Sequence, residues 1–493
     1  MKDHSAITLG RLFPRYALAP SAHRLPVHGI ADDSRLLKRG DVFFVKERSS
    51  FDIFSVLASL EKDACAFVVE RAHQEKIRRI ITRATLIVVD DIEQEFRRVV
   101  DCFYGFSADD FIFIGVTGTN GKTTVATLLH YVLQKHGARV ALFGTVCYDI
   151  GGKKFAATHT TPDYLALRKF FAIAKNKQVK YIVMEVSSHA LTQGRVEGIP
   201  FAVCIFTNLT RDHLDYHVTM RQYFAAKRLL FQKNRKATMI INGDDTYGKK
   251  LLHLFPRAIS FGIAPSARIR AQAIALSAAR TEFEMVIGKR KQHIRSLLVG
   301  RFNVLNILAA LAALGALRLP LGLLARCVRT FRGAPGRLQR VSSHIFVDYA
   351  HTPDAFEKTL RTLRDIGYER IICVFGCGGN RDVGKRRQMG AIAARYAAAI
   401  FITSDNPRTE KPQDICRQIQ KGIAAGRSRV IIDRRRAIEK ALELYSQTRE
   451  KGYNKCCVLI TGKGHEDFQI FGTKKIPFND TCVARNILTH VYN

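Results

Sequence analysis

The sequence is short of acidic residues and lacks the patterns of several protein classes. Its 43 aspartate and glutamate residues stand against 78 lysine and arginine residues, which gives a formal charge of +35 at pH 7. Its 11 cysteines form no C-x-x-C pair, so we expect reduced thiols, a cytoplasmic protein and no structural zinc site. The N-terminus has no apolar segment of the secretory type, and no run reaches the ~18 apolar residues that span a bilayer.

The excess of positive charge favours anionic partners such as nucleotides, sugar nucleotides, nucleic acid or acidic lipid. The basic residues are spread along the chain, so a generally basic composition without functional meaning is the alternative. No basic stripe with interleaved aromatic residues is present, and we therefore expect no nucleic-acid partner. The longest apolar run, Ile307 to Leu317, stops at Arg318 and predicts a core helix.

A chain of 493 residues is too long for one core, so we expect several α/β domains. Short apolar runs separated by helical stretches predict strands of mostly parallel, doubly wound sheets. In the first part of the chain these runs are 43–45, 66–69 and 86–89. In the middle part they are 111–116, 140–143, 181–184, 203–206 and 239–241. In the last part they are 345–347, 371–375, 399–402, 430–432 and 458–460.

The segment Phe111–Thr124 predicts a buried strand, a glycine-rich turn and a helix, which is the layout of a nucleotide phosphate cradle. Lys122 can reach the β- and γ-phosphates, and the Thr123 hydroxyl can ligate Mg²⁺. The strict motif requires glycine where Val116 stands, so a glycine-rich structural turn is the alternative. The predicted cradle residues are Gly118, Thr119, Asn120, Gly121, Lys122, Thr123 and Thr124.

Polar residues gather after two further strands of the middle part. Glu185 follows a buried strand and is a candidate Mg²⁺ ligand, although a strand-end glutamate is usually only solvated. The segment Thr207–His217 places two aspartates and two histidines, among them His213, within six residues. That density suits metal or phosphate chemistry better than a core.

The string Gly118–Thr124 resembles the ATP site of the Mur ligase family and of the related folylpolyglutamate synthetases. The match extends over nearly the whole chain and implies three domains: a small N-terminal α/β domain, a central P-loop ATPase-type parallel sheet and a C-terminal dinucleotide-fold-like α/β domain. The implied bounds are 1–107 for the uridine-nucleotide domain, 108–336 for the ATP-binding domain and 337–493 for the amino-acid-binding domain. The residues around Lys227 do not indicate a role for it, but the resemblance implies that it carries a CO₂-derived carbamate. Burial or neighbouring cations would lower its pKa and make that modification feasible.

The resemblance also assigns residues to the other ligands. The implied contacts to the UDP-linked muramoyl dipeptide are Ser34, Thr160, Thr161, Ser187, Gln193 and Arg195. The implied further contacts to ATP are Asn303, Arg337, Asp348 and His351. One Mg²⁺ would be held by Thr123 and Glu185, and a second by His213 with carbamylated Lys227. Lys122, Lys227 and His213 are the implied catalytic residues.

The last part of the chain contains an amino-acid pocket whose chemistry is readable from its residues. Two arginines offer bidentate capture of a carboxylate, and the acidic and amide groups offer acceptors to an ammonium. A turn capped by Asp-Asn-Pro is the alternative. By resemblance the site fits meso-diaminopimelate, since L-lysine lacks the distal carboxylate. The residues are Arg381, Asp405, Asn406, Pro407, Arg408, Gly462 and Glu466.

The implied activity is an ATP-dependent ligase that adds meso-diaminopimelate to UDP-N-acetylmuramoyl-L-alanyl-D-glutamate through an acyl phosphate, with a monomeric protein expected. Three positions depart from the family pattern: Lys46–Phe51 lacks its glycines, His159 replaces an asparagine, and Asn380 replaces an aspartate. None of these three departures removes a residue that is assigned to phosphate binding, metal binding or the carbamate. The alternatives are an L-lysine-adding ligase, a folylpolyglutamate synthetase, a basic nucleic-acid-binding ATPase and a non-catalytic scaffold.

Overall fold

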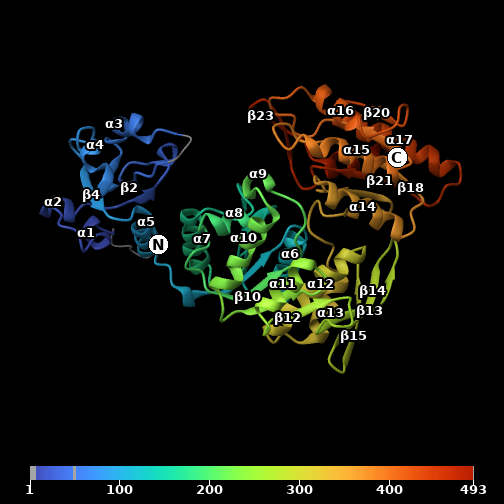
Figure 1. Cartoon of the computed structure of the whole chain (residues 1–493), viewed down its shortest axis with the longest axis horizontal. Helices are drawn as coiled ribbons and strands as arrows, with labels where there is room; N and C mark the ends of the chain where they lie inside the picture. The colour runs from blue at the N-terminus through green and yellow to red at the C-terminus, as the bar shows by residue number, and fades with distance from the viewer. Residues whose placement is uncertain (1–6, 48–50, 492–493) are drawn as a thin grey trace. The chain divides into compact units, whose positions relative to one another are not determined.

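The computed structural model describes residues 7–47 and 51–491 and divides the chain into two compact units. The first unit holds the chain up to Asp110 together with Asp163–Gln178, and the second holds Phe111–Pro162 and the chain from Val179 onward. Figure 1 shows their helices and strands. The segment that returns to the first unit contains helix α7 (Tyr164–Asn176).

The first unit is a parallel sheet in the order β1-β2-β3-β4 with a core on each face. Successive strand residues point to opposite faces, so Phe44 and Val68 join one core while Phe43 and Phe67 join the other. The strands are β1 (Gly29–Ala31), β2 (Asp41–Phe44), β3 (Ala64–Glu70) and β4 (Thr85–Val89). The helices are α1 (Leu9–Leu12), α2 (Pro20–His23), α3 (Leu57–Leu60), α4 (Gln74–Arg78), α5 (Ile92–Tyr104) and α7.

Helix α7 is tied to α5 by a buried arginine. Arg168 donates from Nε to Asp101 Oδ1 at 2.8 Å and from Nη2 to the Tyr164 hydroxyl at 3.0 Å. Its guanidinium also lies over the Tyr164 ring. Because burying an unpaired charge is costly, this pairing favours the packing of α7 against α5.

The second unit begins with a sheet of 11 strands in the order β15-β14-β13-β12-β11-β10-β5-β9-β6-β7-β8. The strands from β13 to β6 pair in parallel, and antiparallel pairs extend the sheet at both ends. The strands are β5 (Ile112–Thr117), β6 (Val140–Phe143), β7 (Cys147–Ile150), β8 (Lys153–Ala156), β9 (Tyr181–Glu185), β10 (Phe201–Phe206), β11 (Thr238–Asn242), β12 (Ile259–Gly262), β13 (Ile269–Leu276), β14 (Thr281–Ile287) and β15 (Arg290–Ser296).

The helices of this part cover the sheet and include the apolar run noted in the sequence. The run Ile307 to Leu317 lies mostly within α12 and is buried over most of its length, so the prediction of a core helix is confirmed. Among the described residues, no helix is both long enough and apolar enough to cross a bilayer. The helices are α6 (Lys122–Lys135), α8 (Ser188–Thr192), α9 (Leu214–His217), α10 (Met220–Lys233), α11 (Thr246–Leu254), α12 (Arg301–Ala316) and α13 (Leu321–Thr330).

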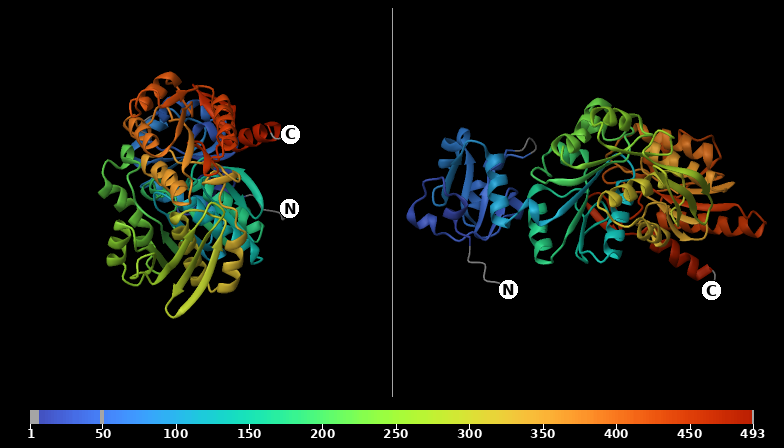
Figure 2. Two further views of the ribbon diagram at one scale, coloured as in Figure 1. Left: turned by 90° about the vertical axis from the view of Figure 1, so that its right-hand side faces the viewer. Right: turned by 90° about the horizontal axis from the view of Figure 1, so that it is seen from below.

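The chain ends in a second sheet of the same unit, in the order β16-β17-β21-β18-β19-β20. Helices α14, α15 and α16 form a core on one face, and α17 and α18 form a core on the other. Figure 2 shows the ribbon from two further sides. The strands are β16 (Gln339–Ser342), β17 (Ile345–Asp348), β18 (Arg370–Phe375), β19 (Ala399–Ile402), β20 (Ser428–Val430), β21 (Cys456–Thr461) and the hairpin β22 (Phe468–Phe471) and β23 (Lys474–Pro477). The helices are α14 (Pro353–Asp365), α15 (Gly384–Tyr396), α16 (Pro412–Gln420), α17 (Arg434–Glu450) and α18 (Asp480–Val491).

The predicted strands recur in the structure with one shift. The run 430–432 predicts a strand, but β20 ends at Val430 and the two isoleucines follow it. β20 is an edge strand with exposed residues, so an apolar run does not mark it. The antiparallel strands β7, β8 and β13–β15 were not predicted, because their outer positions are polar. All 11 cysteines are free, as expected.

Candidate active site

The strand, glycine-rich turn and helix of the predicted phosphate cradle are present, with the turn at the carboxyl end of β5. Gly118 and Gly121 have φ of +148° and +90°, and Gly121 directly precedes the first residue of α6. A Cβ on Gly118 would lie 1.9 Å from Thr207 Oγ1, and one on Gly121 would lie 2.4 Å from Asn306 Oδ1. Both positions therefore require glycine, and the turn leaves the N-terminal amides of α6 available to an anion.

Two lysines, buried Lys227 and half-buried Lys122, share one carbonyl oxygen of this turn. The Lys122 amine donates to Gly118 O at 2.9 Å and Thr119 O at 2.8 Å, and the Lys227 amine donates to Gly118 O at 2.9 Å. Burial and the neighbouring Lys122 hold the pKa of Lys227 well below the ordinary lysine value. Burial also lowers the pKa of Lys122. Two full cations on one acceptor repel each other, so this arrangement favours a neutral amine at Lys227.

Glu185 and Thr123 form a corner of oxygen atoms beside the cradle. Glu185 is 1% exposed, and its Oε2 accepts from Thr123 Oγ1 at 2.9 Å and from Thr145 Oγ1 at 3.2 Å. The other oxygen accepts from Thr145 N at 2.8 Å. A buried carboxylate with neighbouring hydroxyls is a donor set that suits Mg²⁺. Among the described residues, no three His, Cys, Asp or Glu side chains cluster as a metal site of their own.

The histidine-rich segment after β10 also reaches this region. His213 has φ of +53°, and its Nε2 lies 3.5 Å from Asp212 Oδ2. Burial lowers the pKa of His213 to about 4, although Asp212 opposes the shift. The imidazole is therefore neutral at pH 7, which leaves a ring nitrogen able to ligate a metal.

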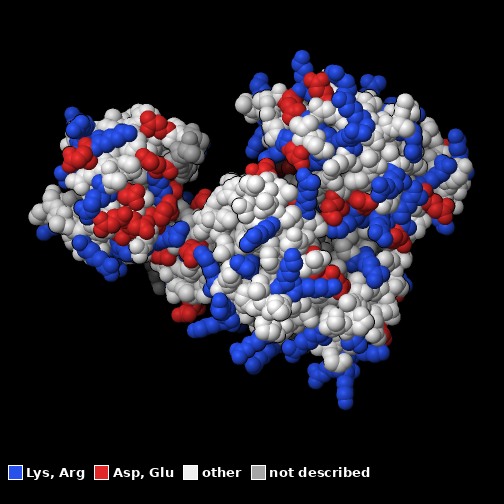
Figure 3. All heavy atoms as spheres, viewed as in Figure 1, with Lys and Arg blue, Asp and Glu red and all other residues white. Residues whose placement is uncertain are grey.

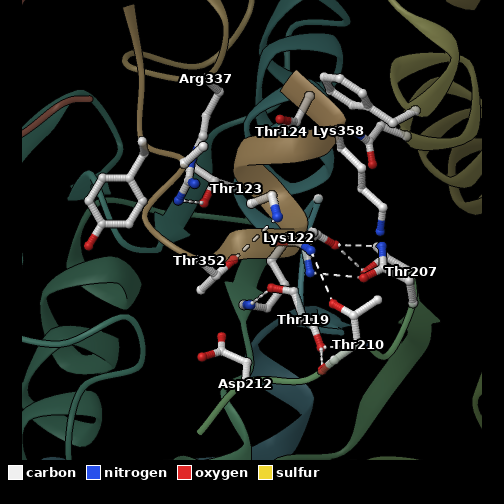
Figure 4. A pocket seen from close by; sticks show the side chains of 18 of the residues that line it. Thr119, Lys122, Thr123, Thr124, Thr207, Thr210, Asp212, Arg337, Thr352 and Lys358 are labelled. Atoms are coloured by element: carbon white, nitrogen blue, oxygen red, sulfur yellow. Dashed lines mark hydrogen bonds between the residues drawn. The ribbon is translucent and has the colours of Figure 1, made fainter. Parts of the chain in front are cut away.

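Arg337 and the start of α14, with Thr352 and Lys358, line the pocket from the other side (Figure 4). Arg337 Nη2 donates to Thr123 Oγ1 at 3.1 Å, and its guanidinium lies over the Tyr349 ring. Asp348 and His351 line the same cavity. Burial raises the pKa of Asp348 and lowers that of His351. Arg337 thus brings a cation to the cradle from a part of the chain more than 200 residues away.

A carboxylate of α14 joins the same two parts of the unit. Asp354 Oδ2 accepts from Asn120 Nδ2 at 3.0 Å, from Thr210 Oγ1 at 3.0 Å and from Lys358 Nζ at 2.9 Å. Asn120 belongs to the cradle, so this oxygen connects the start of α14 with the turn that would hold phosphate. The sequence does not indicate a role for Asp354, because the residues next to it in the chain give no sign of a contact across the unit.

Replacing Asp354 with asparagine is expected to lower kcat/KM for ATP about 10- to 100-fold, the effect of losing a charge-assisted hydrogen bond. Steady-state kinetics at saturating levels of the other substrates measure it. Asp365→Asn, at the exposed end of the same helix, is the matched control and should leave kcat/KM unchanged. Equal values for the two variants would show that the contact has no role in catalysis.

The residues predicted for the dipeptide fall into two groups. Thr161 Oγ1 donates to Glu185 O at 2.7 Å and accepts from Ser187 N at 3.0 Å, and Arg195 Nη1 donates to Thr161 O at 2.9 Å. Gln193 accepts from Arg195 Nε, and Thr160 lines the cavity, so five of the six lie together. The sixth, Ser34, starts a short helical turn in the first unit. Of the segment 46–51, residues 48–50 lie outside the described residues.

Asn303 lies behind the cavity rather than in it. Its Nδ2 donates to Val299 O at 2.8 Å, and its Oδ1 accepts from Asn306 Nδ2 at 3.0 Å. Asn306 itself lines the cavity. One helical turn separates the two asparagines on α12, and only the packing of that helix decides which of them faces the ligand. Further cavity-lining residues that the sequence did not indicate are Thr210, Asn242, Asp244, Asp245, Tyr349 and Lys358.

Residues predicted for the amino-acid pocket lie close together in the structure, and their role stays a prediction. Arg408 has φ of +54°, and its Nη1 donates to Gly379 O at 2.8 Å. A Cβ built on Gly378 would lie 3.1 Å from Arg408 Nη1 and 3.7 Å from Arg381 Cγ, so both arginines approach this glycine. Asn406 Nδ2 donates to Glu466 Oε2 at 2.8 Å.

The loops of this pocket require glycine and a rigid turn. Gly462 has φ of +111°, and a Cβ there would lie 3.0 Å from Asp405 Oδ2. Pro407 is buried beside Gly379, whose added Cβ would lie 1.9 Å from the Pro407 carbonyl oxygen. Arginines and carboxylates are thus brought to one place by segments from the ends of β18, β19 and β21.

Comparison with protein families identifies the family of this chain. Residues 116–314 match the Mur ligase middle domain, and residues 336–464 match the Mur ligase, glutamate ligase domain. The chain belongs to the Mur ligase family. This Mur ligase is accordingly an ATP-dependent enzyme that forms amide bonds.

Individual relatives extend this likeness over the chain. The UDP-N-acetylmuramoyl-L-alanyl-D-glutamate–2,6-diaminopimelate ligase of Thermosynechococcus vestitus is 43% identical over 415 residues, 82% of each chain. A solved structure with that enzyme name is 30% identical with a TM-score of 0.67, covering 99% of this Mur ligase and 100% of the other chain. Folylpolyglutamate synthase of Mycobacterium tuberculosis has a TM-score of 0.62 at 18% identity over 74% of this chain and 90% of the other, which shows a shared fold alone.

Proposed function

We propose that this Mur ligase adds meso-2,6-diaminopimelate to UDP-N-acetylmuramoyl-L-alanyl-D-glutamate, with ATP converted to ADP and phosphate. The observation that carries the proposal is the cluster in which Arg381 and Arg408 approach Gly378 and in which Asp405, Asn406 and Glu466 lie close together. Such a set matches a group with one carboxylate and one ammonium, which the distal end of meso-diaminopimelate provides. Because ATP and UDP-linked sugars are cytoplasmic metabolites, we place the reaction in the cytoplasm.

In the first step, the carboxylate of the dipeptide attacks the γ-phosphorus of ATP and ADP leaves, which produces an acyl phosphate. The amides at the start of α6 bind the phosphates, and the Lys122 amine reduces the charge that builds on the transferring oxygens. Arg337 adds a second cation next to Thr123. Contact of Asp354 with Asn120 holds the two parts of the unit together over the cradle, which excludes water that would hydrolyse the acyl phosphate.

The oxygen corner at Thr123 and Glu185 fits Mg²⁺, and both side chains would hold it. His213 and carboxylated Lys227 would hold a second ion. When bound, Mg²⁺ would neutralise charge on the phosphates, the usual role of this ion in phosphoryl transfer.

We further propose that Lys227 carries a carbamate in the active enzyme. A neutral amine bonds to the carbon of CO₂ and releases one proton, which leaves an N-carboxylate. The lowered pKa of Lys227 provides the neutral amine, and the nearby Lys122 provides a counter-ion for the product. The modification thereby converts a repulsion between two lysines into an attraction.

In the second step, the amine of the amino acid attacks the acyl carbon and phosphate leaves. The two arginines hold the distal carboxylate, and the cluster of Asp405, Asn406 and Glu466 receives the distal ammonium. Capturing both groups orients the reacting amine. L-lysine lacks the carboxylate and would leave both arginines without their partner, so it is the disfavoured substrate.

The test is phosphate release from ATP with UDP-N-acetylmuramoyl-L-alanyl-D-glutamate and either meso-diaminopimelate or L-lysine. We expect release and tripeptide product with meso-diaminopimelate alone. Turnover with L-lysine alone would keep the ligase and reject the carboxylate pocket. No phosphate release with either amino acid would favour a folate substrate or a nucleic-acid-dependent ATPase. The basic side chains on the face shown in Figure 3 are dispersed rather than gathered in one stripe, which argues against the nucleic-acid-dependent ATPase.

Replacing Arg408 with lysine is expected to raise KM for meso-diaminopimelate about 10- to 100-fold, because an ammonium cannot form the bidentate contact of a guanidinium. KM for ATP should stay within about twofold, since the arginine acts in the second pocket. Initial rates at varied amino acid measure both constants. Arg417→Lys, on the exposed side of α16, is the control. A parallel loss of affinity for ATP would contradict the assignment.

A further inference from the structure

The amino-acid pocket contains a buried lysine for which the reaction described above has no use. Lys463 lies in the loop that follows β21, between Gly462 at φ +111° and Gly464 at φ +55°. Its side chain is 0% exposed. The loop packs closely against Tyr349, because a Cβ on Gly464 would lie 2.6 Å from Tyr349 Cβ. The lysine is therefore held inside a pocket that we assign to an ammonium.

The Lys463 amine is surrounded by the groups that would receive the substrate. It donates to Asn406 Oδ1 at 3.1 Å and to Glu466 Oε2 at 2.9 Å, and it lies 3.7 Å from Asp405 Oδ1. Asn406 Nδ2 donates to the same Glu466 oxygen at 2.8 Å. One cation thus fixes the orientation of both the amide and the glutamate.

One buried oxygen of this cluster has no donor. Asp405 is buried, and within the described residues its Oδ1 has no hydrogen-bond partner, although the Lys463 amine lies 3.7 Å from it. A buried acceptor without a donor is costly, and a substrate ammonium would supply the missing donor.

We propose that Lys463 is a positioning residue that acts as an internal counter-ion: it occupies Glu466 and Asn406 and leaves Asp405 as the principal acceptor for the distal ammonium of the substrate. This inference rests on the proposed function, since it assumes a diamino acid in the pocket. Without Lys463, two carboxylates would compete for one ammonium, and neither would be held in place.

The test compares two substrates in the wild type and in Lys463→Met. The substrates are meso-diaminopimelate and 2-aminopimelate, which keeps the distal carboxylate but lacks the distal amino group. In Lys463→Met we expect KM for meso-diaminopimelate to rise about 10- to 100-fold. The preference for it over 2-aminopimelate, taken as the ratio of kcat/KM, should fall by at least about tenfold. KM for ATP should not change. Lys474→Met, an exposed lysine of β23, is the matched control and should behave as wild type.

Several outcomes would overturn the inference. If Lys463 were purely structural, its replacement would reduce turnover of both substrates equally. If it had no role, turnover of neither would change. In both cases the ratio of kcat/KM values would stay at its wild-type value. Lys463→Gln, which keeps a donor but not the charge, gives the same comparison if the methionine variant does not fold, as thermal unfolding would show. A wild-type enzyme that does not use meso-diaminopimelate would instead overturn the proposed function.

Discussion

Replacing Lys122 with methionine is expected to lower kcat about 10²- to 10³-fold, the loss seen when one preorganised donor to a developing negative charge is removed. The amine lies at the half-buried cradle and donates to the carbonyls of Gly118 and Thr119. It is therefore held in position before the nucleotide arrives, and its contribution grows as negative charge shifts onto the transferring oxygens. Single-turnover formation of ADP measures the effect on the chemical step.

The control for this experiment lies on the same helix. Lys135→Met removes an exposed lysine from the last turn of α6 and should leave kcat unchanged. Thermal unfolding of both variants separates a catalytic loss from a folding defect. If Lys122→Met lowered affinity for ATP but left single-turnover ADP formation at the wild-type rate, the lysine would serve ground-state binding only.

Replacing Lys227 with methionine is expected to reduce kcat by a similar factor, about 10²-fold or more, because a charge that positions Mg²⁺ and balances Lys122 would be lost. Short carboxylates such as acetate or formate should restore part of the activity, since they can supply the missing anion. Lys233→Met, a half-exposed lysine at the end of α10, is the control and should show neither loss nor rescue. Loss of activity without any rescue would argue that the amine itself is required.

The carbamate can be observed directly. Wild-type protein in ¹³C-bicarbonate should show a carbamate carbon signal that Lys227→Met lacks. Because the pKa of Lys227 is lowered, the reactive neutral amine is present near neutral pH. Lowering the pH returns the proton to the amine, so the signal should fall on acidification and recover when the pH is raised. An unchanged signal in Lys227→Met would place the modification elsewhere.

Local features of the active site were predictable from the sequence because they depend on short stretches of chain. The strand-turn-helix pattern around Gly118–Thr124 depends only on residues within it, namely two glycines at positive φ and a lysine at the start of a helix. Strand-end positions such as Glu185 follow from the rule that ligands collect at the carboxyl ends of parallel strands. The roles of these residues stay predictions, whereas their placement around one cavity is observed.

Other features depend on contacts between distant segments. Asn303 and Asn306 are indistinguishable in a helical pattern, and only the packing of α12 turns Asn306 toward the cavity. Helix α7 follows the strands of the second unit in the sequence, yet the buried pair Arg168–Asp101 ties it to the first. The sequence near these residues predicts neither the orientation of Asn306 nor the unit to which α7 belongs.

The sequence by itself determined the α/β class, most of the strands, the phosphate cradle and the family resemblance, because each depends on neighbouring residues or on a short motif. The tertiary structure alone decided how charges are paired. It placed two lysines on one carbonyl oxygen, joined Asp354 to Asn120 across more than 200 residues, and enclosed Lys463 between two carboxylates. The physical reason is that the energy of a buried charge depends on its spatial neighbours, and those neighbours are far away in the chain.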